Sequence, residues 1–227
     1  MRRHLRAYTL VAACLVFVSV TVPGEAGLLD GSTDLTGGWR WLEWFGQFND
    51  ANVPWIYHLQ HGWLHVNEVD ASSAWMWSPS LGWLYVSSTL YPHIYLDWFE
   101  NWVYCEADSL SPVWFYDYGV GEWFNFWTGQ DIAFAVNSQR SRMIEFRVTY
   151  SGTFQGQHCS GNYTSTTALG GPLAVSDGAF RLEGTSFSLA GRFTSDTTAS
   201  IDIQWSGRND HCDADYSGNR SYTATRQ

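Results

Sequence analysis

Apolar and polar side chains alternate with a period of two along most of this chain, which is the pattern of β-strands. The alternation is clearest in three aromatic segments, residues 55–66, 75–86 and 114–126. They share the pattern W-x-[YW]-x4-G-W-[LF]-x-[VF], with one extra residue in the third. The first two begin twenty residues apart, and the third begins close to two such periods later. This internal repeat predicts a repeated structural unit.

Each aromatic segment is predicted to be a β-hairpin. Turn-forming residues (Pro, Ser, His and Asp) lie at the centre of the segments, followed by Gly62, Gly82 or Gly121, and glycine adopts the positive φ that tight turns need. A single hairpin is only marginally stable in water, so several must pack together. We therefore expect a stacked-hairpin or meander sheet over residues 27–130.

The second half, residues 131–227, also alternates but has a different composition. Thirteen of the fourteen tryptophans lie between Trp39 and Trp127, and Ser, Thr and Gly dominate after residue 130. Short alternating runs separated by Gly, Asn and Asp predict a small antiparallel β-sandwich or barrel. The predicted strands are residues 143–152, 152–159, 178–184, 186–195, 199–205 and 221–226. The predicted fold class is therefore all-β, with an aromatic hairpin or meander array followed by this domain.

Residues 1–26 have the composition of a secretory signal peptide. A short basic start precedes an apolar run, and small residues surround a cleavage point after Ala26. The apolar run is too short for a comfortable membrane span, and no comparable stretch follows it. The sequence thus predicts a protein that is secreted or at the cell surface, without a transmembrane segment in the mature chain.

The net charge excludes several classes of partner. The chain carries −10 at neutral pH, and removal of residues 1–26 makes this about −12. All its basic residues are arginines, and they form no basic stripe. Nucleic acid and anionic membrane surfaces are therefore not expected partners. Acidic charge favours solubility and is compatible with divalent cations.

Both halves resemble modules of secreted bacterial proteins. The Gly62-Trp63 and Gly82-Trp83 pairs, in units of about twenty residues, resemble choline-binding and related cell-wall-binding repeats, in which aromatic side chains of neighbouring hairpins enclose ligand sites. The strand after these pairs is Leu-x-Val and lysine is absent, so a choline site is not carried over. The pieces GTFQG (152–156), VSDGAF (175–180) and LAGRFTSDTTAS (189–200) resemble a small extracellular β-module. These resemblances imply folds and an extracellular setting.

Aromatic rings beside the turn glycines are the candidate ligand-binding residues. Modules of this kind bind sugars by stacking pyranose faces on Trp or Tyr rings whose polar atoms reach water. The candidates are Trp63, Trp83, Tyr85 and Trp123. The alternative is that these rings fill the thin core of a hairpin stack. The expected partner is a glycan or a cell-envelope component.

Three cysteines remain after removal of the signal peptide, and an oxidising compartment favours pairing. Cys159 and Cys212 lie in the same half and would close a loop of about fifty residues. With His158 and His211 they could instead form a Cys2His2 zinc site, but adjacent residues on a strand point to opposite faces. We predict the disulfide. Cys105, in an apolar run, is predicted to be a small buried hydrophobic residue.

A calcium site is a further hypothesis. Asp213, Asp215 and Ser217, followed by Gly218, match the start of a calcium-binding loop, where alternate oxygen atoms face one cation. The twelfth position is Ala224 rather than the bidentate Glu of an EF-hand. The alternative is a solvated acidic turn. No other cofactor is expected.

Catalytic motifs are absent from the sequence. It contains no G-x-S-x-G, H-E-x-x-H, phosphate-binding or dinucleotide-binding motif. Glu100, Glu106 and Asp108 could form a carboxylate pair beside aromatic walls, as in glycosidases. The sequence therefore predicts a non-catalytic binding protein. A structural or adhesion protein of the envelope is the alternative, and a glycoside-active enzyme is the third.

Overall fold

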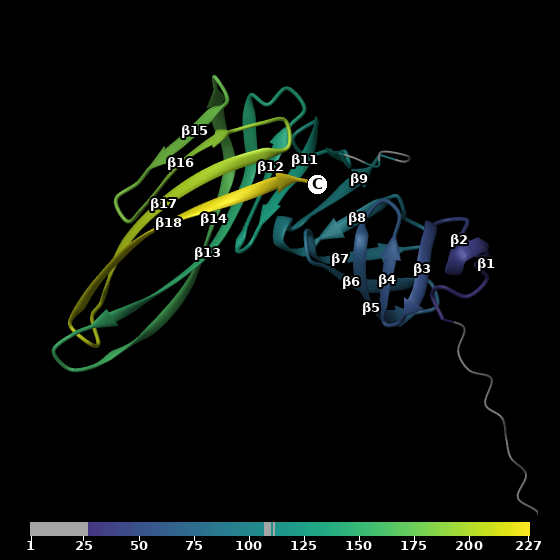
Figure 1. Cartoon of the computed structure of the whole chain (residues 1–227), viewed down its shortest axis with the longest axis horizontal. Helices are drawn as coiled ribbons and strands as arrows, with labels where there is room; N and C mark the ends of the chain where they lie inside the picture. The colour runs from purple at the N-terminus through teal and green to yellow at the C-terminus, as the bar shows by residue number, and fades with distance from the viewer. Residues whose placement is uncertain (1–26, 107–109, 111) are drawn as a thin grey trace, which may run out of the picture.

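The computed structural model describes residues 27–106, 110 and 112–227, so the predicted signal peptide and Asp108 lie outside the described residues. In this part of the chain every strand pairs antiparallel with the next one in sequence, from the first to the last, which makes one continuous meander (Figure 1). The prediction of an all-β fold is confirmed. No helix among these residues is long and apolar enough to cross a membrane.

The first half of the meander contains short strands and two 3-10 turns. The elements are β1 (Thr33–Asp34), η1 (Thr36–Gly38), β2 (Trp39–Leu42), β3 (Gly46–Asn52), β4 (Trp55–His58), β5 (Gly62–Asp70), β6 (Ser73–Ser78), β7 (Gly82–Ser87), β8 (His93–Leu96), η2 (Asp97–Phe99), β9 (Asn101–Cys105) and β10 (Phe115–Asp117). The aromatic repeats are the hairpins β4–β5, β6–β7 and β10–β11, as the sequence predicts.

The second half is an eight-stranded antiparallel barrel. The strands are β11 (Glu122–Gly129), β12 (Ile132–Asn137), β13 (Arg142–Gln155), β14 (Ser160–Ser176), β15 (Ala179–Glu183), β16 (Phe187–Phe193), β17 (Thr198–Asn209) and β18 (Ala214–Arg226). The last strand pairs back with the first through Trp127–Arg226 and Thr128–Thr225, which closes the barrel. Of the two architectures that the sequence left open, the structure has the barrel.

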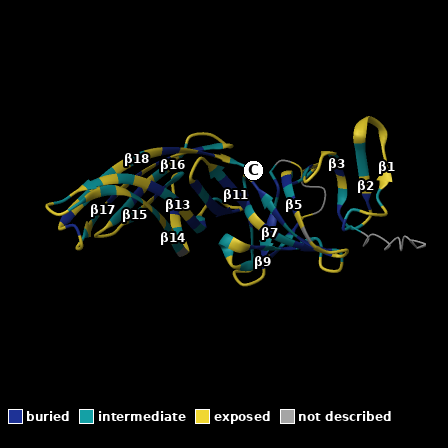
Figure 2. Cartoon of the chain, turned by 90° about the horizontal axis from the view of Figure 1, so that it is seen from below, coloured by how far each residue is buried: buried dark blue, intermediate teal, exposed yellow. Residues whose placement is uncertain are grey.

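Exposure alternates along the strands of both halves (Figure 2). In the barrel, apolar side chains point inward, and mostly Ser, Thr, Asn, Asp and Arg point outward. In the first half the inner face carries mainly aliphatic residues such as Ile56, Leu64 and Leu84. The aromatic residues that alternate with them in β4 to β9 point to the other face, where they are half-buried or exposed.

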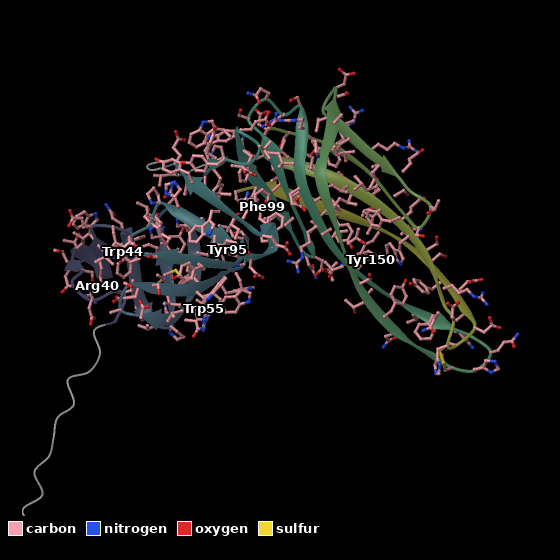
Figure 3. The ribbon with its side chains drawn as sticks, turned by 180° about the vertical axis from the view of Figure 1, so that it is seen from behind. Arg40, Trp44, Trp55, Tyr95, Phe99 and Tyr150 are labelled. Carbon is pink, nitrogen blue, oxygen red and sulfur yellow. A yellow bond between two sulfur atoms is a disulfide. The ribbon has the colours of Figure 1, made fainter. Side chains whose placement is uncertain are left out.

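The strand β11 belongs to both halves of the molecule. Phe124 and Phe126 pack into the first core, whereas Trp127 packs into the barrel and donates from Nε1 to Asn125 Oδ1 at 2.9 Å. The ring of Phe99, in η2, stacks on Phe124 at 5.4 Å between ring centroids, and Figure 3 shows Phe99 at the junction. The boundary predicted at residue 130 falls in the turn after β11, so the first barrel strand lies before it.

Two hairpins, β13–β14 and β17–β18, extend beyond the closed part of the barrel as a pair of arms (Figure 1). The predicted disulfide, Cys159–Cys212, joins the tips of the two arms. Between the arms the ring centroids of Tyr150 and Trp205 lie 4.6 Å apart. The Nε1 of Trp205 donates to the Tyr163 hydroxyl at 2.6 Å. The arms are therefore held together by aromatic packing and by one covalent bond.

Candidate ligand-binding site

The fourth residue of each aromatic repeat explains why the hairpins form. His58, Ser78 and Asp117 are buried on the inner face, and each accepts hydrogen bonds from two backbone N–H groups of its own turn. The glycine that follows has φ near +70°, at 71° for Gly62 and 69° for Gly82. A buried acceptor thus closes the turn, and a left-handed glycine starts the return strand. The next residue, Trp63 or Trp83, is thereby placed on the outer face.

The outer aromatic rings touch one another in edge-to-face pairs, and we call this surface the aromatic face. Successive strands contribute to it. The ring centroids of Trp55 and Trp77 lie 5.8 Å apart, and those of Trp75 and Tyr85 lie 5.5 Å apart. The stick view shows Trp55 and Tyr95 among these side chains (Figure 3). Edge-to-face contacts stabilise aromatic pairs while leaving ring faces open. The aromatic face therefore combines a structural role with exposed ring surface.

The structure places the four predicted ligand-binding residues on this face but not in one cluster. Trp63 and Trp83 are 45 % and 42 % exposed, whereas Tyr85 and Trp123 are half-buried. Tyr85 follows Trp83 on β7 and points to the same side. Trp63 packs against Tyr57, and Trp123 packs against rings of β9 and β10. Only Trp83 and Tyr85 share one region of the surface.

A shallow hollow of about 280 Å³ beside Trp83 is the strongest candidate for a ligand site. It is lined by Trp75, Trp83, Asn67 and Asp97. Asn67 lies opposite Trp75 in the β5–β6 ladder, so both side chains point to the aromatic face. Asp97 begins η2, directly after β8, and its side chain is exposed. Two indole rings, an amide and a carboxylate thus meet at one place.

A second hollow of about 400 Å³ continues from the first toward the barrel. It shares Trp83 and Asp97 with the first hollow, and the barrel contributes Asp131 and Arg147. Asp131 forms an ion pair with Arg220 at 3.5 Å. Arg147 is exposed and forms no ion pair with any residue that the structure describes. The combined surface, here called the Trp83 groove, has aromatic walls and both donors and acceptors.

The predicted carboxylate set is only partly described. Glu106 is exposed, Asp108 lies outside the described residues, and Glu100 is left-handed, with φ 51°. Glu100 influences a different carboxylate, Glu145 of β13. Partial burial, and secondly the charge of Glu100, raise the pKa of Glu145 to about 7. The carboxylate that Glu100 influences is therefore Glu145, which is not in the predicted set.

The cation hypotheses concern the tip of the β17–β18 arm. The guanidinium of Arg208 forms ion pairs with Asp210, Asp213 and Asp215, at 3.0 Å for Asp215. Ser217 lies further along β18 with its side chain outward. Among the described residues no group of three or more His, Cys, Asp and Glu side chains is placed to hold a metal ion. The calcium site stays a prediction, with Arg208 now neutralising part of the acidic cluster.

The cysteines lie where the sequence predicts. The two sulfur atoms of Cys159 and Cys212 are bonded to each other, so neither is available to the alternative zinc site. Cys105 is reduced and fully buried, and burial raises the pKa of its thiol well above the usual range. It packs as a small apolar residue of the first core.

Comparisons of this chain with family models, with curated proteins and with solved structures give no match. The function is therefore inferred from the Trp83 groove itself. Three of its residues, Trp75, Asn67 and Asp97, were not among the sequence candidates. Trp75 has the first position of a repeat, and the alternation that places Trp83 outward places Trp75 beside it. Asn67 and Asp97 carry no comparable signal, because only the strand pairing brings them together.

Proposed function

We propose that this chain is an exported, non-catalytic binding protein that recognises a glycan or glycan-containing envelope component in the Trp83 groove. The observation that carries the proposal is the meeting of the exposed Trp83 ring with Trp75, Asn67 and Asp97. Indole rings offer flat apolar surface to the C–H face of a pyranose. The amide and the carboxylate offer directional hydrogen bonds to its hydroxyl groups. Such a combination suits a sugar better than a purely apolar ligand.

Two further features support an extracellular setting. The disulfide between the arm tips fits an oxidising compartment. The outer surface of the barrel is rich in Ser, Thr and Asn and is mostly uncharged apart from scattered Asp and Arg residues. Both agree with secretion through the predicted signal peptide. Secretion and glycan recognition are parts of this proposal.

The groove can be tested by titrating polysaccharides while following tryptophan fluorescence and migration in polysaccharide-containing gels. We expect Trp83→Ala to weaken binding at least about tenfold, because a central aromatic contact contributes on the order of 1–2 kcal/mol. Trp63→Ala is the matched control, since Trp63 is equally exposed but lies outside the groove. Equal losses in both variants, or a flat response of the parent protein to a broad glycan panel, would contradict the proposal.

The glycosidase alternative is favoured by Glu145, whose pKa is raised to about 7 by partial burial and secondly by the charge of Glu100. A raised carboxyl pKa beside a second carboxylate is typical of a general acid in glycoside hydrolysis. The same glycan panel separates the two functions. Release of reducing ends by the parent protein, and its loss in Glu145→Gln, would establish catalysis instead of binding alone.

A further inference from the structure

The outer edge of the β13–β14 arm has no partner strand along most of its length. β15 pairs with β14 only at Val175 and Ser176. Over residues 160–169, β14 pairs with β13 alone, and no backbone hydrogen bond joins its other edge to the described residues. Figure 1 shows the β13–β14 arm extending from the barrel, and Figure 3 shows the same arm from behind. We call residues 160–169 the β14 edge.

The sequence explains why β14 leaves its neighbour. Gly170, Gly171 and Pro172 interrupt the strand between its two parts, and the register with β13 shifts at this place. Gly171 has φ 108°, which L-residues with side chains rarely adopt, and proline has no N–H to donate to a ladder. In the register that pairs Val175 with Phe180, the last residue of β15, Glu183, would reach only Pro172, so β15 is also too short to cover the β14 edge.

The β14 edge carries none of the features that protect exposed strands from pairing. From Val148 to Ser176 the chain contains no Asp, Glu, Lys or Arg. Residues 160–169 contain no proline, and threonine and tyrosine favour strand pairing. The other arm differs, because Arg208 and three aspartates surround the end of β17. Natural proteins use such charges to prevent strand addition.

We propose that the β14 edge pairs antiparallel with the β14 edge of a second copy of this chain. The net charge of −10 makes two copies repel wherever their carboxylates meet, and the uncharged arm avoids this repulsion. The second copy supplies an edge of equal length with the same missing hydrogen bonds. The resulting interface is isologous and has twofold symmetry.

The side chains match in such a pair. A twofold axis at Ser165 places Thr164 opposite Thr166 of the second copy, so exposed β-branched residues meet on the outer face. On the inner face Tyr163 comes diagonally beside Leu169, and both are only half-buried in one copy. The partner strand therefore covers apolar surface and at the same time forms the backbone hydrogen bonds that the β14 edge lacks.

Sedimentation and light scattering of the purified protein, over roughly two decades of concentration, test the proposal. We expect a reversible monomer–dimer equilibrium with a doubling of mass. The double variant Thr164→Lys, Thr166→Lys places four lysines at the axis and should be monomeric where the parent is a dimer. The control Ser200→Lys, Gln204→Lys changes exposed residues of β17, which is paired on both sides, and should remain dimeric.

A monomeric parent protein, or a dimer that survives the β14 substitutions, would overturn the proposal. Loss of the dimer in the β17 control as well would equally overturn it, because the effect would then come from charge alone. If the β14 variant does not fold, hydrogen exchange of the backbone amides in the parent protein tests the pairing instead. Protection of residues 160–169 that rises with concentration supports the pairing, and protection independent of concentration refutes it.

Discussion

At the scale of single residues, the acceptor at the fourth position of each repeat controls the hairpin. Ser78 is fully buried, and its Oγ accepts from the N–H groups of Ser80 and Leu81 at 3.3 and 3.2 Å. Removing the hydroxyl leaves two backbone donors near the interior without this acceptor. Histidine, serine and aspartate share little except a hydrogen-bond acceptor at a suitable distance from the backbone. The repeat therefore conserves this chemistry among its copies rather than a residue type.

We predict that Ser78→Ala lowers the free energy of unfolding by about 1–3 kcal/mol, the typical cost of unsatisfied buried donors. Urea denaturation followed by tryptophan fluorescence measures the change. Ser200→Ala is the control, because Ser200 is exposed on β17 and should be within about 0.5 kcal/mol of the parent. A Ser78→Ala protein as stable as this control would show that water replaces the hydroxyl.

His58 plays the same role but adds a dependence on pH. Its Nε2–H donates to the Phe45 carbonyl at 2.7 Å, and its Nδ1 accepts from two backbone N–H groups, which requires the neutral ring. Burial lowers the pKa of His58 to about 4, and this effect outweighs the hydrogen bond that the ring donates to the Phe45 carbonyl, which raises the pKa. The stacked neighbour His61 also has a lowered pKa, because of burial and secondly the proximity of His58.

We predict that the free energy of unfolding falls as the pH is lowered from about 6.5 toward 4. In this window the unfolded chain binds protons that the folded chain excludes, at up to about 1.4 kcal/mol per pH unit for each histidine. Glu145 acts in the opposite direction, because its raised pKa, about 7, stabilises the fold at low pH and this contribution is lost as the pH rises. The measurement is therefore made in Glu145→Gln protein.

His58→Asn is the diagnostic variant, because asparagine can accept the turn N–H groups without titrating. It should reduce the pH slope by about half if His61 supplies the rest. An unchanged slope in this variant would assign the pH dependence to other groups.

At the scale of elements, the arms are built from cross-strand pairs of a glycine and an aromatic residue. Trp205 lies opposite Gly218, and Tyr216 lies opposite Gly207. On the other arm Tyr163 lies opposite Gly152. In each pair the aromatic side chain covers the glycine, so that an added Cβ would lie within 2.5 Å of the ring or, for Gly152, of the tyrosine hydroxyl. Large rings fit inside the narrow arms because the facing residue has no side chain.

Gly218→Ala is predicted to destabilise the protein by about 1–3 kcal/mol, because the new methyl group would meet the Trp205 ring at 2.4 Å. The ring is nearly buried and held by its hydrogen bond to Tyr163, so it has little room to move. Thermal or urea denaturation measures the effect, with Asn219→Ala on the outer face as control. A stable Gly218→Ala protein would mean that the arms open easily.

The hairpins themselves were predictable from the sequence, whereas the choice of which hairpin face is buried was not. Alternation, the turn residues and the glycines identify β4–β5, β6–β7 and β10–β11 from the sequence alone. The pattern also shows that aromatic and aliphatic residues occupy opposite faces. It does not show which face becomes the core, because both are apolar. The aliphatic face is buried, so rings such as Trp63 and Trp83 are on the surface rather than in the interior.

At the scale of the whole molecule, one strand joins two cores. β11 is buried on both faces over Phe124–Trp127, and a run of four apolar or amide residues there breaks the alternation. This break is visible in the sequence. The strand that pairs with β11 to close the barrel is β18, almost a hundred residues away, and short-range sequence patterns do not identify such a distant partner. The Trp83 groove depends on the same closure, because Arg147 and Asp131 reach it from the barrel.

The shared strand leads to a prediction about cooperativity. The disulfide lies at the far tips of the barrel arms and joins residues 53 apart in sequence, and its loss should cost about 4 kcal/mol in the chain-entropy model. Thirteen of the fourteen tryptophans lie at or before Trp127, so fluorescence mainly reports the other half. Because β11 serves both cores, we expect Cys159→Ser, Cys212→Ser to shift the fluorescence transition together with that of far-ultraviolet circular dichroism.

The two tryptophans of the barrel core can be removed with Trp127→Phe and Trp205→Phe in both proteins, which confines the fluorescence signal to residues 39–123. If the two cores unfold as one unit, the disulfide variant lowers the midpoint of this signal although no tryptophan lies near the missing bond. A fluorescence midpoint that does not move, while circular dichroism shows an earlier barrel transition, would show that the halves unfold independently. The barrel side of the Trp83 groove would then be lost at a lower denaturant concentration than its aromatic side, and glycan binding in mild denaturant would weaken before tryptophan fluorescence changes.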